Sequence, residues 1–349
     1  MMKKAIISLS MMGLFLLFQC SQSYANTFSE QYQTSNLKAF LKNGSILFEQ
    51  RYAKDRTAEL ICISVDEQTQ WKIELPWSEY GGSVLGQAGD DIFYAYRSLD
   101  HNILILNRYS QAGDLLSTYS MPKDTGMCFL VKNYVYFISD GNLKFCDANG
   151  KVSSIATENS IPFVSLFRAV GNDAKHVFLL STKTAKDAGC MLLALDQNRK
   201  EFWTYPLETV STLNANEINI AISLDGHVCI ADFSTDEDDR FGITLLNEWG
   251  NEMWTKKILL PVGENAWLSL IHMSNDGIIQ LWGSARSPVQ SISSWKMTID
   301  YNGEVIEKYT YPDWIDFVSF TNEEPYGVLD PQGTPTLIRE KDIDWVIQK

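Results

Sequence analysis

Several features that mark common enzyme classes are missing from this sequence. It has no Gly-x-Ser-x-Gly nucleophile turn, no His-Glu-x-x-His zinc motif and no GxxxxGK phosphate-binding loop. Only four histidines are present, so a site built on imidazole would need at least two of them to converge. His176 and His227, which open equivalent strands of neighbouring repeats, are the candidate pair. The motif-defined hydrolases, zinc enzymes and nucleotide-binding enzymes are therefore disfavoured.

Basic residues are also scarce. The chain has 29 Lys and Arg against 43 Asp and Glu, for a formal charge of −14 at pH 7. A surface of this sign repels phosphate backbones, so we expect no nucleic-acid partner. An acidic balance usually serves solubility, and a cationic ligand, a basic protein or bound calcium are the functional alternatives.

Long apolar runs are absent after the first residues, so we expect no transmembrane segment in the mature chain. Lys3 and Lys4 precede an apolar run and a small-x-small site that ends at Ala25, which predicts a signal peptide over residues 1–25. Export to the periplasm or the cell exterior follows. Lipidation of Cys20 is the less favoured alternative, because Gln19 is larger than the residue that normally precedes a lipidated cysteine.

Cysteine usage gives no sign of a metal or haem site, because no CxxC or His/Cys cluster occurs. Five cysteines remain after residue 25, and an odd number leaves at least one unpaired. Most of them stand in apolar strand patterns, which favours buried free thiols. Cys128 and Cys146 lie within one repeat and are the candidate disulfide.

What the sequence does contain is a repeated turn followed by an apolar or alternating strand. Successive turns are separated by 40 to 52 residues; they are Asn43-Gly44, Asp90-Asp91, Asn133-Tyr134, Asp173-Ala174, Asp225-Gly226, Asp276-Gly277 and Glu323-Glu324. About four short strands fit each interval, which is typical of a β-propeller. We predict an all-β fold: a single propeller over residues 26–349 with seven four-stranded blades, six or eight being the alternatives. No Pro/Gly/Ser-rich linker divides it.

The last repeat is compressed. Its predicted strands are 317–320, 326–329, 336–339 and 345–347, with residues 27–32 as an alternative source of the outer strand. Either arrangement would close the ring and remove exposed sheet edges.

A second turn series, in phase with the first, carries a family resemblance. Ala194-Leu195-Asp196 with Trp203, Gly250 with Trp254 and Asp66 with Trp71 resemble the repeats of quinoprotein-type (PQQ-like) propellers, in which Ala-x-Asp, a Gly turn and a docking Trp recur. WD40 repeats are the other similar family, although their Gly-His and Trp-Asp dipeptides do not recur. The resemblance implies packing between blades. The catalytic members hold PQQ beside an adjacent-cysteine disulfide and calcium, and this chain has no adjacent cysteines.

An acidic run offers one candidate metal site. Its carboxylates could hold calcium, although the run lacks the alternating ligands and central glycine of an EF-hand loop. The candidate ligands are Asp232, Asp236, Asp238 and Asp239. An exposed acidic loop is the simpler interpretation, and no cofactor is otherwise predicted.

The candidate binding surface lies in loops that lead from an outer strand to the next inner strand. Each loop combines an aromatic ring with carboxylates, which could stack a sugar or peptide side chain or cage a cation. The candidate residues are Trp77, Glu79, Tyr80, Glu264, Trp267, Asp313, Trp314 and Asp316. The alternative is that the tryptophans wedge between blades and the acids face water.

These features predict an exported, non-catalytic propeller that binds a protein or peptide partner as a scaffold module in the cell envelope. A small carbohydrate is a further possible ligand. The alternative function is a carbohydrate-active enzyme, a propeller lyase or glycoside hydrolase, using carboxylates or His272 at the channel.

Overall fold

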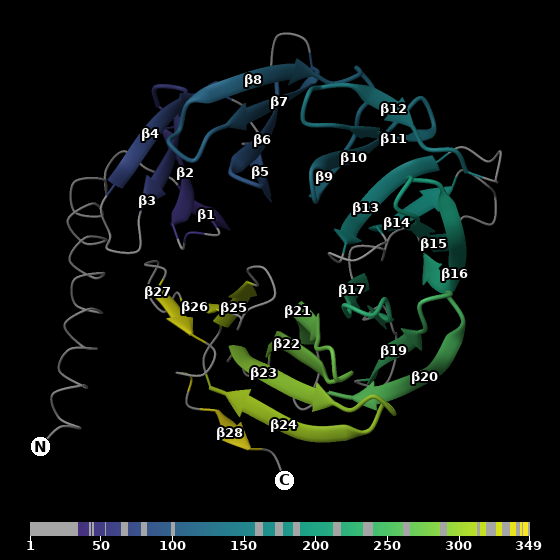
Figure 1. Cartoon of the computed structure of the whole chain (residues 1–349). Coiled ribbons are helices and arrows are strands. Elements are labelled where there is room, and N and C mark those ends of the chain that lie inside the picture. Colours follow the sequence, from purple (N-terminus) through teal and green to yellow (C-terminus); the bar gives the residue numbers. More distant parts are fainter. Residues whose placement is uncertain are drawn as a thin grey trace, which may run out of the picture. The chain divides into compact units, whose positions relative to one another are not determined.

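The computed structural model describes 34–41, 43, 45–52, 54–63, 69–77, 82–98, 102–157, 163–171, 177–183, 189–211, 218–232, 240–260, 266–286, 292–312, 315–318, 326–329, 336–339, 343 and 345–347. In these ranges the regular elements are all β-strands, as predicted (Figure 1). These described ranges contain no helix that is long and apolar enough to cross a membrane. The described strands form seven antiparallel sheets. The strands of each sheet are consecutive in sequence, except that one sheet has an additional strand from the end of the chain.

The chain divides into two compact units, and the first spans residues 1–123. Its described strands form two four-stranded sheets whose first strands contact each other. The first sheet contains β1 (Thr34–Phe40), β2 (Ile46–Tyr52), β3 (Thr57–Ile63) and β4 (Thr69–Leu75). The second contains β5 (Gly82–Ala88), β6 (Asp91–Arg97), β7 (Leu104–Tyr109) and β8 (Leu115–Ser120).

The second unit spans residues 124–349. Its first three sheets are β9 (Cys128–Val131), β10 (Tyr134–Ser139), β11 (Asn142–Cys146) and β12 (Val152–Ser154); β13 (Phe163–Gly171), β14 (Val177–Lys183), β15 (Gly189–Leu195) and β16 (Glu201–Ser211); and β17 (Ile218–Ile222), β18 (Val228–Asp232), β19 (Arg240–Leu246) and β20 (Glu252–Leu259). The last two are β21 (Ala266–Met273), β22 (Ile279–Arg286), β23 (Ile292–Ile299) and β24 (Val305–Tyr311), with β28 (Val346–Ile347) added; and β25 (Ile315–Val318), β26 (Tyr326–Leu329) and β27 (Thr336–Arg339). The first strands of successive sheets contact one another, which is a propeller-like arrangement.

The hydrophobic core of the second unit lies between neighbouring sheets. Phe241 and Leu245 of β19 belong to the same buried cluster as Ile279 of β22 and Trp295 of β23. Inner strands are therefore covered on both faces, and four of the five residues of β18 are buried. The outer strand β20 has only one buried residue because one of its faces meets water. Repeated apolar runs in the sequence thus correspond to inner strands, and alternating runs to outer strands.

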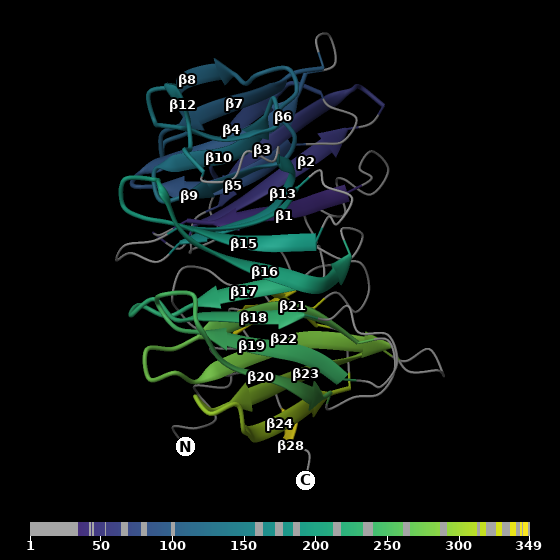
Figure 2. The ribbon, with the colours of Figure 1, turned by 90° about the vertical axis from the view of Figure 1, so that its right-hand side faces the viewer.

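Where these connections are described, as in the sheet of β17–β20, tight turns join the first strand to the second and the third to the fourth. In the turn before β24, Asp300 Oδ1 accepts hydrogen bonds from the backbone N–H of Asn302 and Glu304, at 2.9 and 2.8 Å. Gly303, at φ +80°, takes a conformation that residues with a Cβ rarely adopt. Both kinds of turn lie at the same end of the strands in the second unit, on the left in Figure 2.

An indole from one sheet docks on such a turn of the following sheet. Each ring donates its Nε1–H to a backbone carbonyl: Trp71 to Gln111 at 2.7 Å, Trp203 to Glu248 at 3.1 Å and Trp254 to Tyr301 at 2.8 Å. The glycine of the turn lies against the ring, and a Cβ on Gly250 would stand 2.5 Å from Trp203 Cδ2. The repeated Trp and Gly therefore pack neighbouring sheets, with Gly250 beneath Trp203 of the preceding sheet.

The end of the chain departs from the predicted seventh repeat. The strands predicted at 326–329 and 336–339 are present as β26 and β27, and the described part of their sheet has three strands. The strand predicted near 345–347 joins the preceding sheet instead, where β28 pairs Ile347 with Tyr309 and Val346 with Thr310. Residues 27–32 lie outside the described residues.

The predicted Cys128–Cys146 disulfide is absent. Cys128 on β9 lies opposite Phe137 and Cys146 on β11 lies opposite Val135, so β10 separates the two cysteines. Two strand spacings place their backbones roughly 10 Å apart, beyond the reach of a disulfide. The prediction of buried free thiols is confirmed for Cys62, Cys146, Cys190 and Cys229.

Candidate functional site

Only part of the predicted loop surface falls within the described residues. Trp77 is half-buried, and the Arg51 guanidinium lies over its ring at 4.6 Å from the centroid. Trp267, near the start of β21, is 39% exposed. Asp316 lies in β25, where only the backbone is described. The others lie outside the described residues: Glu79, Tyr80, Glu264, Asp313 and Trp314.

The acidic run is likewise described only at its beginning. Asp232 ends β18, while Asp236, Asp238 and Asp239 lie outside the described residues. Among the residues that are described, no group of three or more His, Cys, Asp or Glu side chains is arranged to hold a metal ion. Calcium therefore stays a sequence-based prediction.

The enzyme alternative placed His272 at the channel. His272 is half-buried on β21, and burial lowers the pKa of its imidazole. The other candidate, His227, has its intended partner His176 outside the described residues. It nevertheless belongs to a well-defined polar network at the turn end of the second unit.

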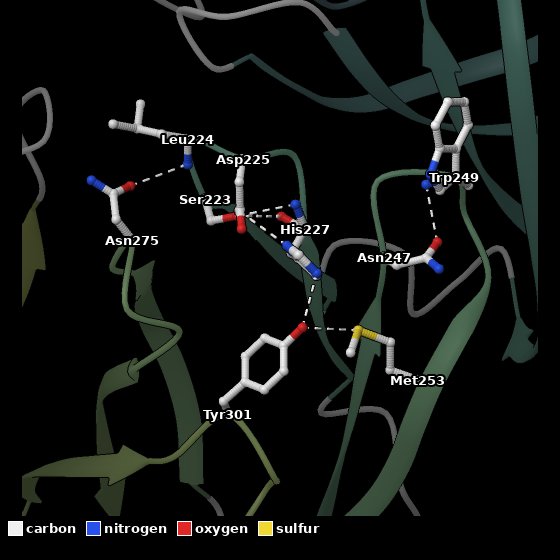
Figure 3. A network of polar contacts seen from close by, with 9 residues as sticks. All are labelled: Ser223, Leu224, Asp225, His227, Asn247, Trp249, Met253, Asn275 and Tyr301. Atoms are coloured by element: carbon white, nitrogen blue, oxygen red, sulfur yellow. Dashed lines mark hydrogen bonds and ion pairs between the residues drawn. The ribbon is translucent and has the colours of Figure 1, made fainter.

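The network is built on the turn from Ser223 to His227 (Figure 3). His227 Nδ1 lies 3.0 Å from Asp225 Oδ1, and His227 Nε2 lies 2.9 Å from the hydroxyl of Tyr301. Ser223 donates its own hydroxyl to Asp225. Burial acts to raise the pKa of Asp225, but the hydrogen bonds from Ser223 and His227 outweigh it and hold that pKa below its ordinary value.

Tyr301 reaches His227 from the following sheet because a glycine makes room for its ring. A Cβ on Gly277 would stand 2.4 Å from Tyr301 Cδ2, so only glycine lets the ring lie there. The Tyr301 hydroxyl is also 3.4 Å from Met253 Sδ. Burial, and then the charge of Asp225, raises the pKa of this hydroxyl. Tyr301 therefore stays protonated at neutral pH and links the sheets of β17–β20 and β21–β24.

These contacts do not form a nucleophile and base. In a serine hydrolase the serine hydroxyl would face a ring nitrogen of histidine. Here the Ser223 hydroxyl bonds Asp225, and Tyr301 lies at Nε2. The equivalent turn Ser274-Asn275-Asp276-Gly277-Ile278 repeats the Ser-to-Asp bond with isoleucine in place of histidine. The Ser-x-Asp-Gly pattern is therefore a turn-building device.

Around this network, large apolar side chains are exposed to water. Trp249 is 60% exposed, and its ring lies 5.6 Å from that of Phe202, which is 38% exposed. Leu224 and Met253 are 46% and 40% exposed. Figure 3 shows Leu224 and Met253 on either side of the Asp225–His227–Tyr301 contacts, with Trp249 on the same side as Met253, next to Asn247. We call Phe202, Leu224, Trp249 and Met253 the aromatic patch.

Carboxylates accompany the aromatic patch. Asp225, Glu248 and Glu252 are exposed. A Cβ on Gly226 would lie 3.2 Å from Glu248 Cβ, so the turns that carry Asp225 and Glu248 touch. Glu252 accepts a hydrogen bond from the Tyr205 hydroxyl at 2.7 Å. The turns 223–227 and 247–251 contain no lysine or arginine, so the patch combines apolar area with negative charge.

The aromatic patch was not predicted from the sequence, in which Gly250 and Trp254 indicated only a turn and its docking indole. One signal was available: a large aromatic residue stands at Trp249, where the aligned turns carry Ala112 and Asn302. Nothing in that turn needs an indole to form, so the residue is a candidate for an external role.

Comparisons with known proteins support the fold. No protein-family model matches the sequence, and no curated protein does. KlHsv2 with loop 6CD replaced by a Gly-Ser linker is 8% identical, with a TM-score of 0.53 over 90% of this chain and 97% of that one. This similarity shows a propeller-like fold.

Other solved structures are similar at lower TM-scores. The eukaryotic initiation factor is 11% identical, with a TM-score of 0.49 over 80% of this chain and 65% of that chain. This chain thus spans slightly less than two thirds of that protein. BBS1N in complex with ARL6DN is 12% identical, with a TM-score of 0.47 over 88% and 91% of the two chains.

Proposed function

We propose that this chain is an exported, non-catalytic seven-bladed β-propeller that binds a protein or peptide partner in the cell envelope. The exposed aromatic patch is the observation that carries the proposal. Trp249 and Phe202 are large rings held in contact at the surface, with 60% and 38% of their areas open to water. Aromatic residues grouped in this way are typical of the energetic centre of a protein interface.

The patch is also preorganised. Asn247 Oδ1 accepts hydrogen bonds from the backbone N–H of Trp249 and Asn251, both at 3.0 Å, which holds the indole-bearing turn in one conformation. Leu224 N–H donates to Asn275 Oδ1 of the next sheet at 3.3 Å. A surface that is already ordered loses little conformational entropy when a partner binds, and this favours recognition.

Export rests on the N-terminal signal pattern, and the seven blades rest on the seven turns of the sequence and the seven sheets of the described strands. The loop with Trp77 in the first unit and the loop with Trp267 in the second remain separate candidate binding regions. Trp267 lies near the start of β21 and Ser274 follows its end, so the Trp267 loop and the aromatic patch would face different partners or different parts of one partner.

A site-specific photo-crosslinker tests the proposal. A benzophenone amino acid replaces Trp249 in one variant and Leu116, a 48% exposed residue of the first unit, in a control. Both proteins are irradiated in an envelope extract of the cells that make the chain. We expect a discrete protein or peptide adduct from position 249 and none from position 116. A folded protein that yields no adduct at 249, or the same adducts at both positions, would refute a binding role for this patch.

A further inference from the structure

The aromatic patch and its carboxylates have the chemistry of a site for positive charge on an apolar peptide. Ring faces attract ammonium and guanidinium groups, with Trp the strongest attractor among aromatic residues. Asp225, Glu248 and Glu252 supply formal negative charge at the same turns and at the start of the adjoining strand. Phe202, Leu224 and Met253 supply the apolar area that a purely ionic site would lack.

The chain uses the same chemistry internally. The Arg199 guanidinium lies 3.5 Å from the centroid of the Tyr134 ring and 4.8 Å from that of Phe145. Arg51 lies over Trp77 in the first unit. Lys256, on the same strand as Met253, is engaged by Glu304 through an ion pair. Trp249, which is 60% exposed, offers a ring face at the surface where an arginine of a partner could stack in the same way.

We propose that the aromatic patch, together with Asp225, Glu248 and Glu252, binds a peptide segment in which basic and apolar side chains alternate. This inference rests on the proposed function and specifies its partner class. A basic side chain stacks on Trp249 beside Glu248, and apolar side chains cover Leu224 and Met253. Charge complementarity favours a basic peptide, because an acidic segment would be repelled by the formal negative charges of Asp225, Glu248 and Glu252.

Two labelled hexapeptides test the inference by fluorescence anisotropy. One alternates arginine and leucine, and the matched control alternates glutamate and leucine. We expect the arginine peptide to bind, and to bind more weakly at about 200 mM than at about 50 mM salt, since exposed charges are screened. Trp249→Ala should lower its affinity roughly tenfold, and Trp249→Phe should restore part of it. Far-UV circular dichroism checks that each variant is folded.

An acidic protein attracts any basic peptide, so the charge contribution needs a matched control. Glu248→Gln with Glu252→Gln removes two carboxylates at the patch, and Glu74→Gln with Glu307→Gln removes two exposed carboxylates from β4 and β24. We expect the first pair to lower the affinity roughly fivefold and the second less than twofold. Equal losses would show attraction by overall charge only and would overturn the inference.

Other outcomes separate the two proposals. Equal binding of the glutamate peptide, unchanged affinity of Trp249→Ala, or competition by a neutral oligosaccharide that depends on Trp249 would each overturn the basic-peptide inference. The crosslinker at position 249 could still capture a protein whose binding is unchanged by the Glu248 and Glu252 substitutions. That result would support the proposed binding function and refute the basic peptide as its partner class. Absence of both crosslinking and peptide binding would refute both.

Discussion

Different side chains accept the same pair of backbone hydrogen bonds in the turns. Asp196 Oδ1 accepts hydrogen bonds from the backbone N–H of Asn198 and Lys200, and Asn247 Oδ1 makes the equivalent pair of bonds. In another turn the hydroxyl of Ser110 takes this place. A short side chain with an acceptor is therefore what the turn requires, and negative charge is not essential.

This equivalence predicts how Asp196 responds to substitution. Asp196→Ala should lower the free energy of unfolding by roughly 0.5–1 kcal/mol, because two backbone donors lose their acceptor at a partly exposed site. Asp196→Asn should cost less, as Asn247 indicates. Urea unfolding of both variants at neutral pH measures the difference. Equal destabilisation by Ala and Asn would show that the charge matters more than the acceptor.

The pH dependence of the same site has a defined sign. Backbone hydrogen bonds, first that from Lys200, hold the pKa of Asp196 below its ordinary value, although burial opposes them. A group whose pKa is lowered by folding contributes its stability above the unfolded value of about 3.9, and that contribution is lost as pH falls through the folded value. Below about pH 4 the wild type should therefore lose more stability than Asp196→Asn. Urea titrations over this pH range provide the check.

Two glycines distinguish backbone strain from steric overlap. Gly250 has φ +78° and lies against Trp203, whereas Gly89 has φ +61° with no atom within 4 Å of the position that a Cβ would take. Gly89→Ala should cost about 1 kcal/mol for the left-handed conformation alone. Gly250→Ala should cost about 1–3 kcal/mol more, because the indole must move. Thermal unfolding of both variants gives the comparison, and equal losses would mean that the ring yields freely.

At the level of elements, the indole that joins one sheet to the next is the repeated connector. Trp254 is half-buried and its Nε1–H bond to the Tyr301 carbonyl is 2.8 Å long, while the bond from Trp203 to Glu248 is 3.1 Å long and exposed. The two hydrogen bonds should therefore contribute different amounts to the free energy of unfolding. Burial decides the amount, because water replaces the lost donor at an exposed carbonyl.

Phenylalanine substitutions measure this difference. Trp254→Phe keeps most of the ring contact and removes the donor, so we expect a loss of about 1–2 kcal/mol. Trp203→Phe should lose less than half as much. Denaturant titrations followed by circular dichroism supply both values. A larger loss at Trp203 would contradict the view that burial of the accepting carbonyl decides the cost.

For the whole molecule, the thiols report on the integrity of both units. Burial raises the pKa of Cys62, Cys146 and Cys190 to about 11, and burial also raises the pKa of Cys229. A rise of two pKa units lowers the thiolate fraction roughly a hundredfold at pH 8, and the buried sulfurs are also shielded from reagents. Cys62 belongs to the first unit and the other three to the second.

Native protein should therefore resist alkylation at these four thiols at about pH 8, whereas denatured protein should react at all of them. Mass spectrometry after a short iodoacetamide pulse, at increasing urea concentrations, gives the extent at each cysteine. Rapid labelling of Cys146 or Cys190 in the absence of urea would contradict the packing around β11 and β15.

Much of the fold was predictable because it is encoded locally. Asp-Gly and Asn-Gly turns, apolar inner strands and alternating outer strands recur along the chain, so the all-β class could be predicted from the sequence. The last repeat was less predictable. β28 has only two residues, so its own sequence does not specify which strand it pairs with. It pairs with β24, the edge strand of the preceding sheet.

The candidate site was predictable only in part. His227 was recognisable as an unusual residue after a repeated turn, but its partner Tyr301 lies 74 residues away, in the turn between β23 and β24. Trp249 and Phe202 meet through the same packing of consecutive sheets. The loops that carry Glu79, Glu264 and Trp314 lie outside the described residues, and for them the sequence-based prediction stands.

The sequence by itself determined what neighbouring residues decide: the turns, the strand periodicity, the acidic balance and the repeated Trp and Gly positions. Tertiary structure alone decided which side chains from different repeats meet. It excluded the Cys128–Cys146 disulfide by placing β10 between the cysteines, and it brought Tyr301 to His227 over Gly277. The physical reason is that turn and strand preferences act over a few residues, whereas contacts between sheets depend on how complete blades pack.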